Sequence, residues 1–464
     1  MNAISQTSGI NPKILAAVVA LPLAVLVAIA ITQVEWSYAA LLLCAPFIVY
    51  LAMKRPFIFP FGLYVFSIPF ENLLVMNGSA HGATLTRLLG VVAILALLLK
   101  GAFERRLKKP DKIDLWWILF TLYCLLSILW SISSSLPLVR VQTIIGLIGL
   151  YVVVSSYRVQ GKEYESVKWL ILAGGALSSI FTIYAYHKGL VNFGEAERVS
   201  LMSLDSASGI GGANKQAFDM LLPLSVCMGM LLKKGRPLAK GSLFLVLFVM
   251  FFGIMITGSR GGLAAAIVVL LCFIFYSKNR LKFAAAASII LVTTFAMTPQ
   301  FYLDRINRSA ETHASGRTDI WRVGLKAMEK YWLFGAGLDC FPNAYTEFVN
   351  YSPVYMGFDR APHNIFVGTF VELGIIGGLL MVIALIKHYA AIGHYAAIGG
   401  KGGRPDADQI ILKAAFWALL VGGLSQDVVW YKSFWLLWMM IVMQKYASQT
   451  GGDRLDRIGA RKGQ

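Results

Sequence analysis

Long apolar segments, separated by short polar turns, run through most of this 464-residue chain. A helix of roughly 17–25 apolar residues crosses the hydrocarbon core of a bilayer, and many of these segments reach or approach that length. The pattern therefore predicts an all-α membrane protein, a polytopic bundle of about 12–14 transmembrane helices. The predicted spans are 14–31, 38–53, 57–76, 85–99, 115–132, 139–156, 167–186, 216–232, 242–257, 262–276, 283–297, 365–386, 411–423 and 433–446.

Polar turns that are rich in Lys and Arg alternate along the chain with polar turns that contain few of them. One set carries many basic residues, as in KGAFERRLKKPDK (100–112) and KKGRPLAK (233–240), and the other set carries few, as in NGSAHGA and SISSS. Basic residues concentrate in the cytoplasmic loops of bacterial membrane proteins. We therefore expect a multi-pass protein of the bacterial inner membrane, with both termini in the cytoplasm and the weakly charged loops in the periplasm.

Composition supports this class and excludes others. The chain is 57% hydrophobic and 14% charged, with a mean hydropathy of +0.67, which is too apolar for a soluble domain. No linker or repeat divides it, so residues 1–464 are expected to form a single polytopic membrane domain. The net charge of +18 follows the loops and forms no basic face interleaved with aromatic residues, so we expect no nucleic-acid partner.

Two longer loops fall on the predicted periplasmic side, at 187–214 and 299–363. Within the second loop, apolar residues recur at the spacing of one helical face. These residues are Trp321, Leu325, Met328 and Trp332. They predict an amphipathic helix that either lies on the outer membrane surface or packs on a small core of the loop itself.

Arginines near this predicted face are the first candidates for chemistry, because ionisable groups at membrane depth are costly and often functional. Arg198 lies in the first long loop, Arg260 lies in TGSRGGL between two spans, and Arg317 opens the amphipathic helix. The planar guanidinium suits bidentate binding of phosphate or pyrophosphate oxygens. The alternatives are a positional anchor at the headgroup level for Arg260 and solvated loop arginines for the other two.

His363 is the candidate catalytic base. It follows Pro362 and directly precedes an apolar helix, and a neutral histidine accepts a proton from a hydroxyl group. A lone histidine at a helix start is also compatible with a purely structural role. His313, in the same loop, is a candidate substrate contact. No His/Cys cluster, HExxH or paired carboxylate motif is present, so no metal site is expected.

Four stretches together resemble the bacterial O-antigen ligase and O-antigen polymerase superfamily. HNIFVGTFVELG resembles its C-terminal signature, and GRTDIWRVGLKAMEKYWLFGAGLDCF resembles its periplasmic-loop signature. TGSRGGLAAAIVVL resembles its arginine-bearing helix start, and AERVSLMSLDSASGIGGANKQAFDMLLPL resembles its loop leading into a span. The Arg-x-x-x-Leu motif of some ligases is not matched, because leucine is the third residue after the arginine in RVSLM and in RGGL.

The resemblance implies a glycosyltransferase at the periplasmic face, acting on a glycan carried by undecaprenyl pyrophosphate. His363 would be the base, and Arg198, Arg260 and Arg317 would bind the pyrophosphate, with Asn214, Lys215 and His313 as further candidate contacts. No cofactor and no metal are implied. The acceptor would be lipid A core for a ligase, a second lipid-linked glycan for a polymerase, or a protein hydroxyl in some relatives. A transporter is the alternative from another class, since charges within spans also mark translocation paths.

Overall fold

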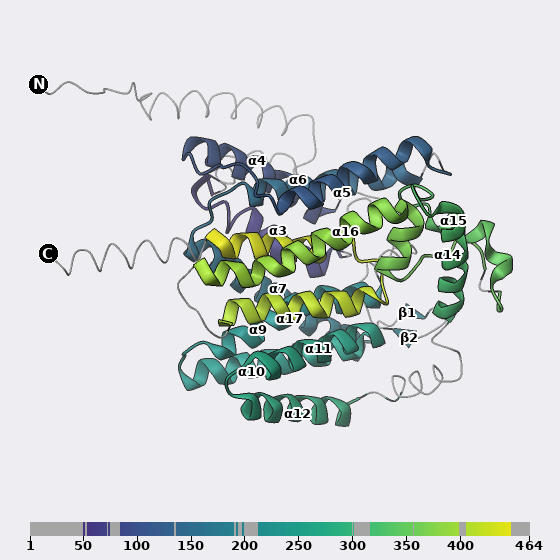
Figure 1. The fold of residues 1–464 in the computed structure, drawn as a ribbon. Coiled ribbons are helices and arrows are strands. Elements are labelled where there is room, and N and C mark those ends of the chain that lie inside the picture. The colour runs from purple at the N-terminus through teal and green to yellow at the C-terminus, as the bar shows by residue number, and fades with distance from the viewer. Residues whose placement is uncertain are drawn as a thin grey trace, which may run out of the picture.

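The protein is a bundle of long helices that lie side by side, as the apolar pattern predicted (Figure 1). This computed structural model describes residues 50–51, 53–71, 73–74, 84–133, 136–189, 192–193, 197–198, 212–298, 300, 316–355, 357–398 and 405–446. Six helices in this part of the chain have the length and apolar composition needed to cross a membrane. The prediction of an all-α polytopic membrane protein is therefore confirmed.

The elements follow the predicted spans closely. They are α3 (Phe61–Ser67), η1 (Ile68–Phe70), α4 (Leu85–Phe103), α5 (Asp114–Leu126), η2 (Ser127–Trp130), α6 (Leu136–Ser155), α7 (Gly161–His187), β1 (Asn192–Phe193), β2 (Glu197–Arg198), α8 (Ala213–Asp219), α9 (Leu221–Leu232), α10 (Pro237–Ile256), α11 (Arg260–Tyr276), α12 (Arg280–Ala296), α14 (Arg317–Tyr331), α15 (Phe341–Glu347), η4 (Val349–Tyr351), α16 (Ile365–Ile398), α17 (Ala407–Gly423) and a helix over 432–446. The predicted span 14–31 and nearly all of 38–53 lie outside the described residues.

Small residues let the central helices approach one another closely. A Cβ on Gly174 of α7 would lie 2.6 Å from the carbonyl oxygen of Phe66 in α3, and one on Gly253 of α10 would lie 2.8 Å from the Cβ of Ser179 in α7. Association of helices in a membrane depends on such close packing, since lipid tails are as apolar as the helices themselves. The glycines of these runs therefore fix how α7 sits between α3 and α10.

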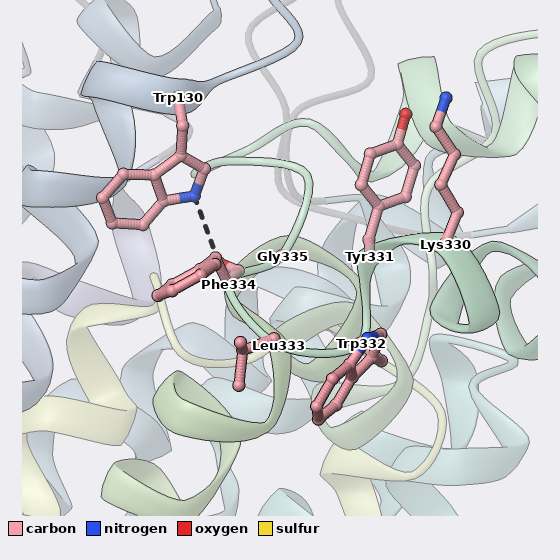
Figure 2. A pocket seen from close by; sticks show the side chains of 7 residues that line it. All are labelled: Trp130, Lys330, Tyr331, Trp332, Leu333, Phe334 and Gly335. Atoms are coloured by element: carbon pink, nitrogen blue, oxygen red, sulfur yellow. Dashed lines mark hydrogen bonds between the residues drawn. The ribbon is translucent and has the colours of Figure 1, made fainter.

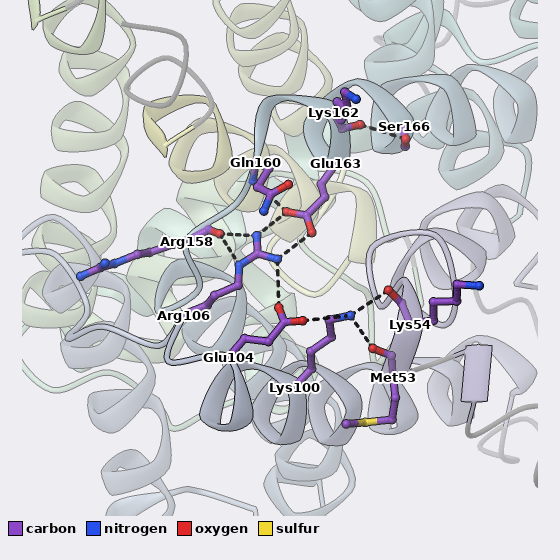
Figure 3. Close-up of polar contacts among 10 residues, drawn as sticks. All are labelled: Met53, Lys54, Lys100, Glu104, Arg106, Arg158, Gln160, Lys162, Glu163 and Ser166. Carbon is purple, nitrogen blue, oxygen red and sulfur yellow. Dashed lines mark hydrogen bonds and ion pairs between the residues drawn. The ribbon is translucent and has the colours of Figure 1, made fainter. Parts of the chain in front are cut away.

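Charged contacts tie the helices together at one end of the bundle, which we call the basic end (Figure 3). The guanidinium of Arg106, just after α4, donates hydrogen bonds to both carboxylate oxygens of Glu163 in α7, at 2.9 and 2.5 Å. Lys100 donates to the carbonyl oxygen of Lys54 at 2.7 Å. Lys168 of α7 binds Asp408 of α17 at 2.6 Å. These pairs hold the basic ends of α4, α7 and α17 in register.

The opposite end, which we call the His363 end, carries α14, α15 and the turns between them, beyond the ends of the long helices (Figure 1). The turn after η2 is fixed to this segment by two hydrogen bonds. Ile132 N donates to the carbonyl oxygen of Ala336 at 2.9 Å, and Leu338 N donates to the Ser127 hydroxyl at 3.0 Å. The short antiparallel pair β1–β2, in which Asn192 lies opposite Arg198, is drawn at the same end.

Helix α16 is not continuous, because its backbone breaks at Gly374. Gly374 has φ 63° and ψ −167°, a region that essentially only glycine occupies. The chain after α14 packs into this break: Ile375 N donates to the carbonyl oxygen of Trp332 at 2.7 Å, and Ala336 N donates to that of Val371 at 2.9 Å. The apolar run after His363 is thus two helices, of which the first lies against α14 and the second enters the bundle.

Candidate functional site

His363 lies between two neighbours that are each fixed by a hydrogen bond. The carbonyl oxygen of Pro362 accepts from the indole Nε1 of Trp321 in α14 at 3.0 Å. On the other side, the Asn364 side chain caps α16, since its Oδ1 accepts from Phe366 N at 2.9 Å and from Val367 N at 3.2 Å. The backbone of His363 is therefore held from both sides. This fixes the point from which the imidazole side chain projects.

The backbone of His363 is itself unusual, with φ 46°. Non-glycine residues at positive φ are uncommon and persist where the surrounding structure holds them, often at functional sites. Burial lowers the pKa of the imidazole to about 4, and the positive charges of Arg317 and Arg360 contribute in the same direction. His363 is consequently neutral at neutral pH and has a nitrogen lone pair available to accept a proton.

Arg260 and Arg317 share one local setting, because each is the first residue of a helix, α11 and α14 respectively. The helix N-terminus carries partial positive charge, so a cation there adds to an already positive field. This arrangement is unfavourable for an isolated helix but well suited to binding an anion. Each is partly buried, and the effect of Arg317 on the His363 pKa shows that these two groups are close.

The turn before Arg260 is built from the residues of the TGSRGG motif. Gly258 has φ 67°, which glycine adopts without strain. The Ser259 hydroxyl accepts a hydrogen bond from Gly262 N at 3.1 Å and caps α11. A glycine of this motif also lets two helices pack closely: a Cβ on Gly262 would lie 2.4 Å from the Cβ of Ala217 in α8.

The turn after α17 joins the Arg260 region to the His363 region. A Cβ on Gly261 would lie 1.9 Å from the Ser425 hydroxyl oxygen, so the start of α11 packs directly on this turn. The neighbouring carbonyl oxygen of Leu424 faces the side-chain amide of Asn364, with 3.4 Å between Nδ2 and the oxygen. Arg260 and His363, about a hundred residues apart in sequence, are thereby brought to the two sides of one short turn.

Of the other residues that were predicted to contact the substrate, the structure describes Arg198, Asn214 and Lys215. The backbone of Arg198 pairs with Asn192 in β1–β2 at the His363 end. Asn214 is partly buried in the first turn of α8. His313 lies outside the described residues.

Lys215 is 7% exposed and is engaged by carboxylates. Its Nζ lies 2.6 Å from Asp219 and 3.4 Å from Glu71. The same cluster includes Lys432, which pairs with Glu71, and Ser433, whose hydroxyl donates to Asp219 at 2.5 Å. Two lysines and two carboxylates balance in charge here. The cluster ties η1, α8 and the helix over 432–446 together.

A second group of charged residues was not singled out from the sequence. Arg140 of α6 donates to Asp339 at 2.7 Å, and Glu372 of α16 accepts a hydrogen bond from Phe341 N at 3.3 Å. Asp427 interacts electrostatically with Arg140 and Asp339, and its burial raises its pKa to about 6. The signal was present in the sequence, since Arg140 and Glu372 interrupt apolar runs. The spacing between them, however, gives no hint that they meet.

The amphipathic helix predicted in the long loop is present as α14. Its most buried residues are Ile320, Val323 and Ala327, which form a small core with α15 and the first part of α16. Leu325 and Trp332, from the predicted apolar face, are 57% and 60% exposed. The helix thus packs on a core of its own loop and still presents apolar side chains at the surface.

A hollow of about 590 Å³ lies beside the end of α14 (Figure 2). Trp130, Trp332, Leu333 and Phe334 line it with apolar surface, and the indole of Trp130 donates to the carbonyl oxygen of Phe334 at 3.2 Å. Lys330 adds a polar group, which is paired with Glu347 of α15. Tryptophans are enriched where membrane hydrocarbon meets water, so this hollow has the composition of a lipid-facing groove.

Nothing in the part of the chain that the structure describes groups three or more His, Cys, Asp or Glu side chains in a metal-binding arrangement. The candidate site itself combines one histidine with several arginines. Neutral imidazole accepts protons, and guanidinium groups stabilise developing negative charge. This combination can support the transfer of a group from a phosphate-type leaving group.

The fold and site together define a multi-pass helical membrane protein with a neutral histidine and two arginines at one end of the bundle. Residues 245–382 match the family model of the O-antigen ligases. The matched stretch runs from α10 into α16 and contains Arg260, Arg317 and His363. The match covers residues 245–382 and supports the resemblance to the O-antigen ligase and polymerase superfamily that the motifs indicate. No curated protein matches the chain.

Proposed function

We propose that this protein transfers a glycan from undecaprenyl pyrophosphate to an acceptor hydroxyl at the periplasmic face of the bacterial inner membrane. The observation that carries the proposal is the position of His363, neutral and held beside Arg317 within the stretch that matches the O-antigen ligases. The concentration of Lys and Arg at the basic end supports a cytoplasmic location for that end. The His363 end would then face the periplasm.

In the proposed reaction, a neutral nitrogen of His363 accepts the proton of the acceptor hydroxyl. The hydroxyl oxygen forms a bond to the anomeric carbon of the donor sugar, and the bond from that carbon to the pyrophosphate oxygen breaks. Undecaprenyl pyrophosphate leaves with the electron pair. Arg260 and Arg317 would stabilise the charge that develops on it, with Arg198 as a further candidate. The proton on His363 then passes to solvent.

The leaving group supplies its own driving force, so the reaction needs neither a nucleotide nor a metal ion. The lipid of the donor would lie along the bundle at the His363 end. The hollow bounded by Trp130 and Phe334 offers apolar surface of the kind that a polyprenyl or acyl chain requires. A lipid A core acceptor makes the protein a ligase, and a second lipid-linked glycan makes it a polymerase.

The test is a transfer assay with purified protein in lipid vesicles and an undecaprenyl-pyrophosphate glycan as donor. Lipid A core and a second lipid-linked glycan are offered in separate reactions, each with and without EDTA. We expect a new glycosidic bond with one acceptor, unaffected by EDTA. His363→Ala is expected to lower the rate by about 10²–10⁴-fold, and His187→Ala, at the end of α7, serves as the matched control.

Two outcomes would contradict the proposal. Retained activity in His363→Ala protein would show that another group accepts the proton. Movement of the donor across the vesicle membrane, without any change in its covalent linkage, would instead identify a transporter.

A further inference from the structure

Three aromatic rings stand exposed on the short segment between α15 and α16. Tyr351, Tyr355 and Phe358 are 60%, 65% and 58% exposed. Tyr355 and Phe358 are in contact, and exposed apolar groups that gather in one place mark binding sites more often than single ones do. None of the three rings takes part in the reaction proposed above, and the small core beneath α14 does not include them among its buried residues.

The segment that carries these rings is held in a defined shape. Asp359 N donates to the Thr346 hydroxyl oxygen at 3.0 Å, and that hydroxyl donates to the Asp359 carboxylate at 3.0 Å. Gly357 and Asp359 have φ 89° and 55°, so the chain turns sharply on both sides of Phe358. The rings are therefore exposed on a fixed support, which lowers the entropy cost of binding a ligand.

The rings also interact with their surroundings in fixed geometries. Tyr355 and Phe358 meet edge to face, with 5.5 Å between ring centroids. The Lys326 ammonium of α14 lies 5.2 Å from the centroid of the Tyr351 ring. Each contact orients a ring and leaves most of its surface open to a ligand.

The chain continues from these rings into His363, since only four residues, 359–362, join Phe358 to it. The segment ends at Arg360, whose charge lowers the pKa of His363 and also acts on the phenol of Tyr345 in α15. A molecule lying on the rings and reaching along the chain would therefore arrive at the proposed base. This continuity distinguishes these rings from the exposed aromatic residues elsewhere on the helices.

The position of the segment argues against a lipid as its ligand. The rings lie between α15 and α16, at the end of the molecule beyond the long helices (Figure 1). The apolar hollow, in contrast, is lined by Trp130 of η2 and by residues at the end of α14 and directly after it. Tyr351 and Tyr355 carry phenol groups, and the segment has charged neighbours, including Lys326 and Arg360. Sugars match this mixture, because their C–H faces stack on aromatic rings while their hydroxyls bind polar groups.

We propose that Tyr351, Tyr355 and Phe358 form a platform for the glycan chain of the donor, several sugar units away from the bond that reacts. The inference rests on the proposed function, because it takes the donor to be a lipid-linked glycan. The platform holds the chain while its first sugar lies at His363. It therefore contributes to substrate affinity, and the chemical step itself proceeds without it.

The test compares donors that carry a single sugar with donors that carry a long glycan, using full-length protein in lipid vesicles. Phe358→Ala and the double variant Tyr355→Ala/Phe358→Ala are expected to raise KM for the long donor about tenfold, equivalent to about 1.4 kcal/mol. The kcat with the long donor and both constants with the short donor should stay unchanged. Phe358→Trp keeps an aromatic face and should restore the KM for the long donor.

The matched control is Phe103→Ala, which removes a ring that is 78% exposed at the basic end. It should leave both donors unaffected. An equal KM for wild type and the double variant with the long donor would overturn the platform, and so would an equal loss with both donors. A loss of activity that follows the lipid composition of the vesicles, with no dependence on glycan length, would identify the rings as a membrane contact instead.

A separate binding measurement tests the platform independently of glycosyl transfer. A soluble glycan fragment without lipid, titrated calorimetrically into wild-type and double-variant protein, should bind only the wild type. Ring-dependent binding without any transfer would retain the platform and refute the transferase. Transfer with no dependence on the rings would refute the platform alone.

Discussion

The indole of Trp321 in α14 donates a hydrogen bond of 3.0 Å to the carbonyl oxygen of Pro362, the residue directly before His363. This single bond connects the amphipathic helix of the long loop to the proposed catalytic base. Because Asn364 caps α16 on the other side of His363, the base lies between two anchored residues. The geometry explains why a long loop outside the bundle would influence a reaction at its edge.

Trp321→Phe keeps the ring and removes the hydrogen bond to Pro362. We expect kcat to fall about tenfold, equivalent to about 1.4 kcal/mol, because the imidazole of His363 is less well positioned. Substrate affinity should change little, so KM is expected to stay near the wild-type value. Steady-state kinetics measure both constants. Trp169→Phe, at a ring that is 56% exposed on α7, is the control, and an equal effect of the two variants would argue against a specific positioning role.

The low pKa of His363, about 4, predicts how activity depends on pH. The base must be neutral, so kcat/KM should stay flat from neutral pH down to about pH 5 and fall as the pH approaches the pKa of the free protein. A bound pyrophosphate would offset the charges of Arg317 and Arg360. The acid limb of kcat should therefore lie at higher pH than that of kcat/KM. If the acid limbs of kcat and kcat/KM coincide near pH 6.5, the ordinary pKa of histidine, then the imidazole of His363 is not in a buried and positively charged environment.

The lowered pKa of His363 also makes the stability of the folded protein depend on pH. The pKa of His363 is lower in the folded protein than in the unfolded chain, where it is about 6.5, so the unfolded chain binds the proton more strongly between these values. Stability contributed by neutral His363 is fully present above about pH 6.5 and is lost as the pH falls toward about 4. Thermal unfolding of wild type and His363→Gln across this range should show a smaller loss in the variant.

Arg260→Lys keeps the positive charge at the start of α11 but removes the planar fork. If Arg260 binds pyrophosphate oxygens in a bidentate way, kcat/KM should fall about 10–100-fold, since a charged bidentate contact is worth about 1.5–3 kcal/mol. The matched control is Arg280→Lys. Arg280 is the first residue of α12 but lies at the basic end, so the same exchange there should leave transfer unchanged. If the Arg260→Lys protein has the kinetic constants of the wild type, Arg260 does not bind pyrophosphate in a bidentate way and is a positional anchor.

Gly374→Ala tests the break in α16. The added Cβ would lie 2.3 Å from the Leu333 carbonyl oxygen, at a backbone conformation unfavourable for any L residue. We expect a loss of more than about 2 kcal/mol of stability, measured as a lower midpoint of thermal unfolding, together with loss of transfer. Gly393→Ala, in the same helix, meets no atom within 4 Å. It should be neutral or slightly stabilising, because alanine favours helix more than glycine does.

The break also explains a sequence signature. In HNIFVGTFVELG, the histidine and the last glycine have ten residues between them. Apolar periodicity predicts one continuous helix from 365 onward and gives no reason for the glycine. The structure supplies one, because the segment after α14 packs its backbone into α16 at Gly374. The spacing keeps the base one short helix away from the point where α16 enters the bundle.

Contacts between residues far apart in the sequence could not be predicted from local patterns either. The pairing of Arg140 with Asp339 joins residues about two hundred positions apart, and Lys215 proved to be held by Asp219 and Glu71. Spacing along a helix indicates which residues share a face, but not which other segment that face meets. The choice between the two alternatives for α14 depends on the same kind of contact, since its neighbours decide which of its apolar residues are covered.

The sequence by itself determined the membrane class, most of the helices in the described part of the chain, and the resemblance to the O-antigen ligases. Each of these follows from local information: the length of an apolar run, the charge of a turn, or the order of residues in a motif. Only the tertiary structure decided that Trp321 anchors the His363 backbone, that Arg317 acts on the His363 pKa, and that the Ser425 turn links α11 to α16. Those relationships depend on contacts between distant segments, which exist only once the bundle is packed.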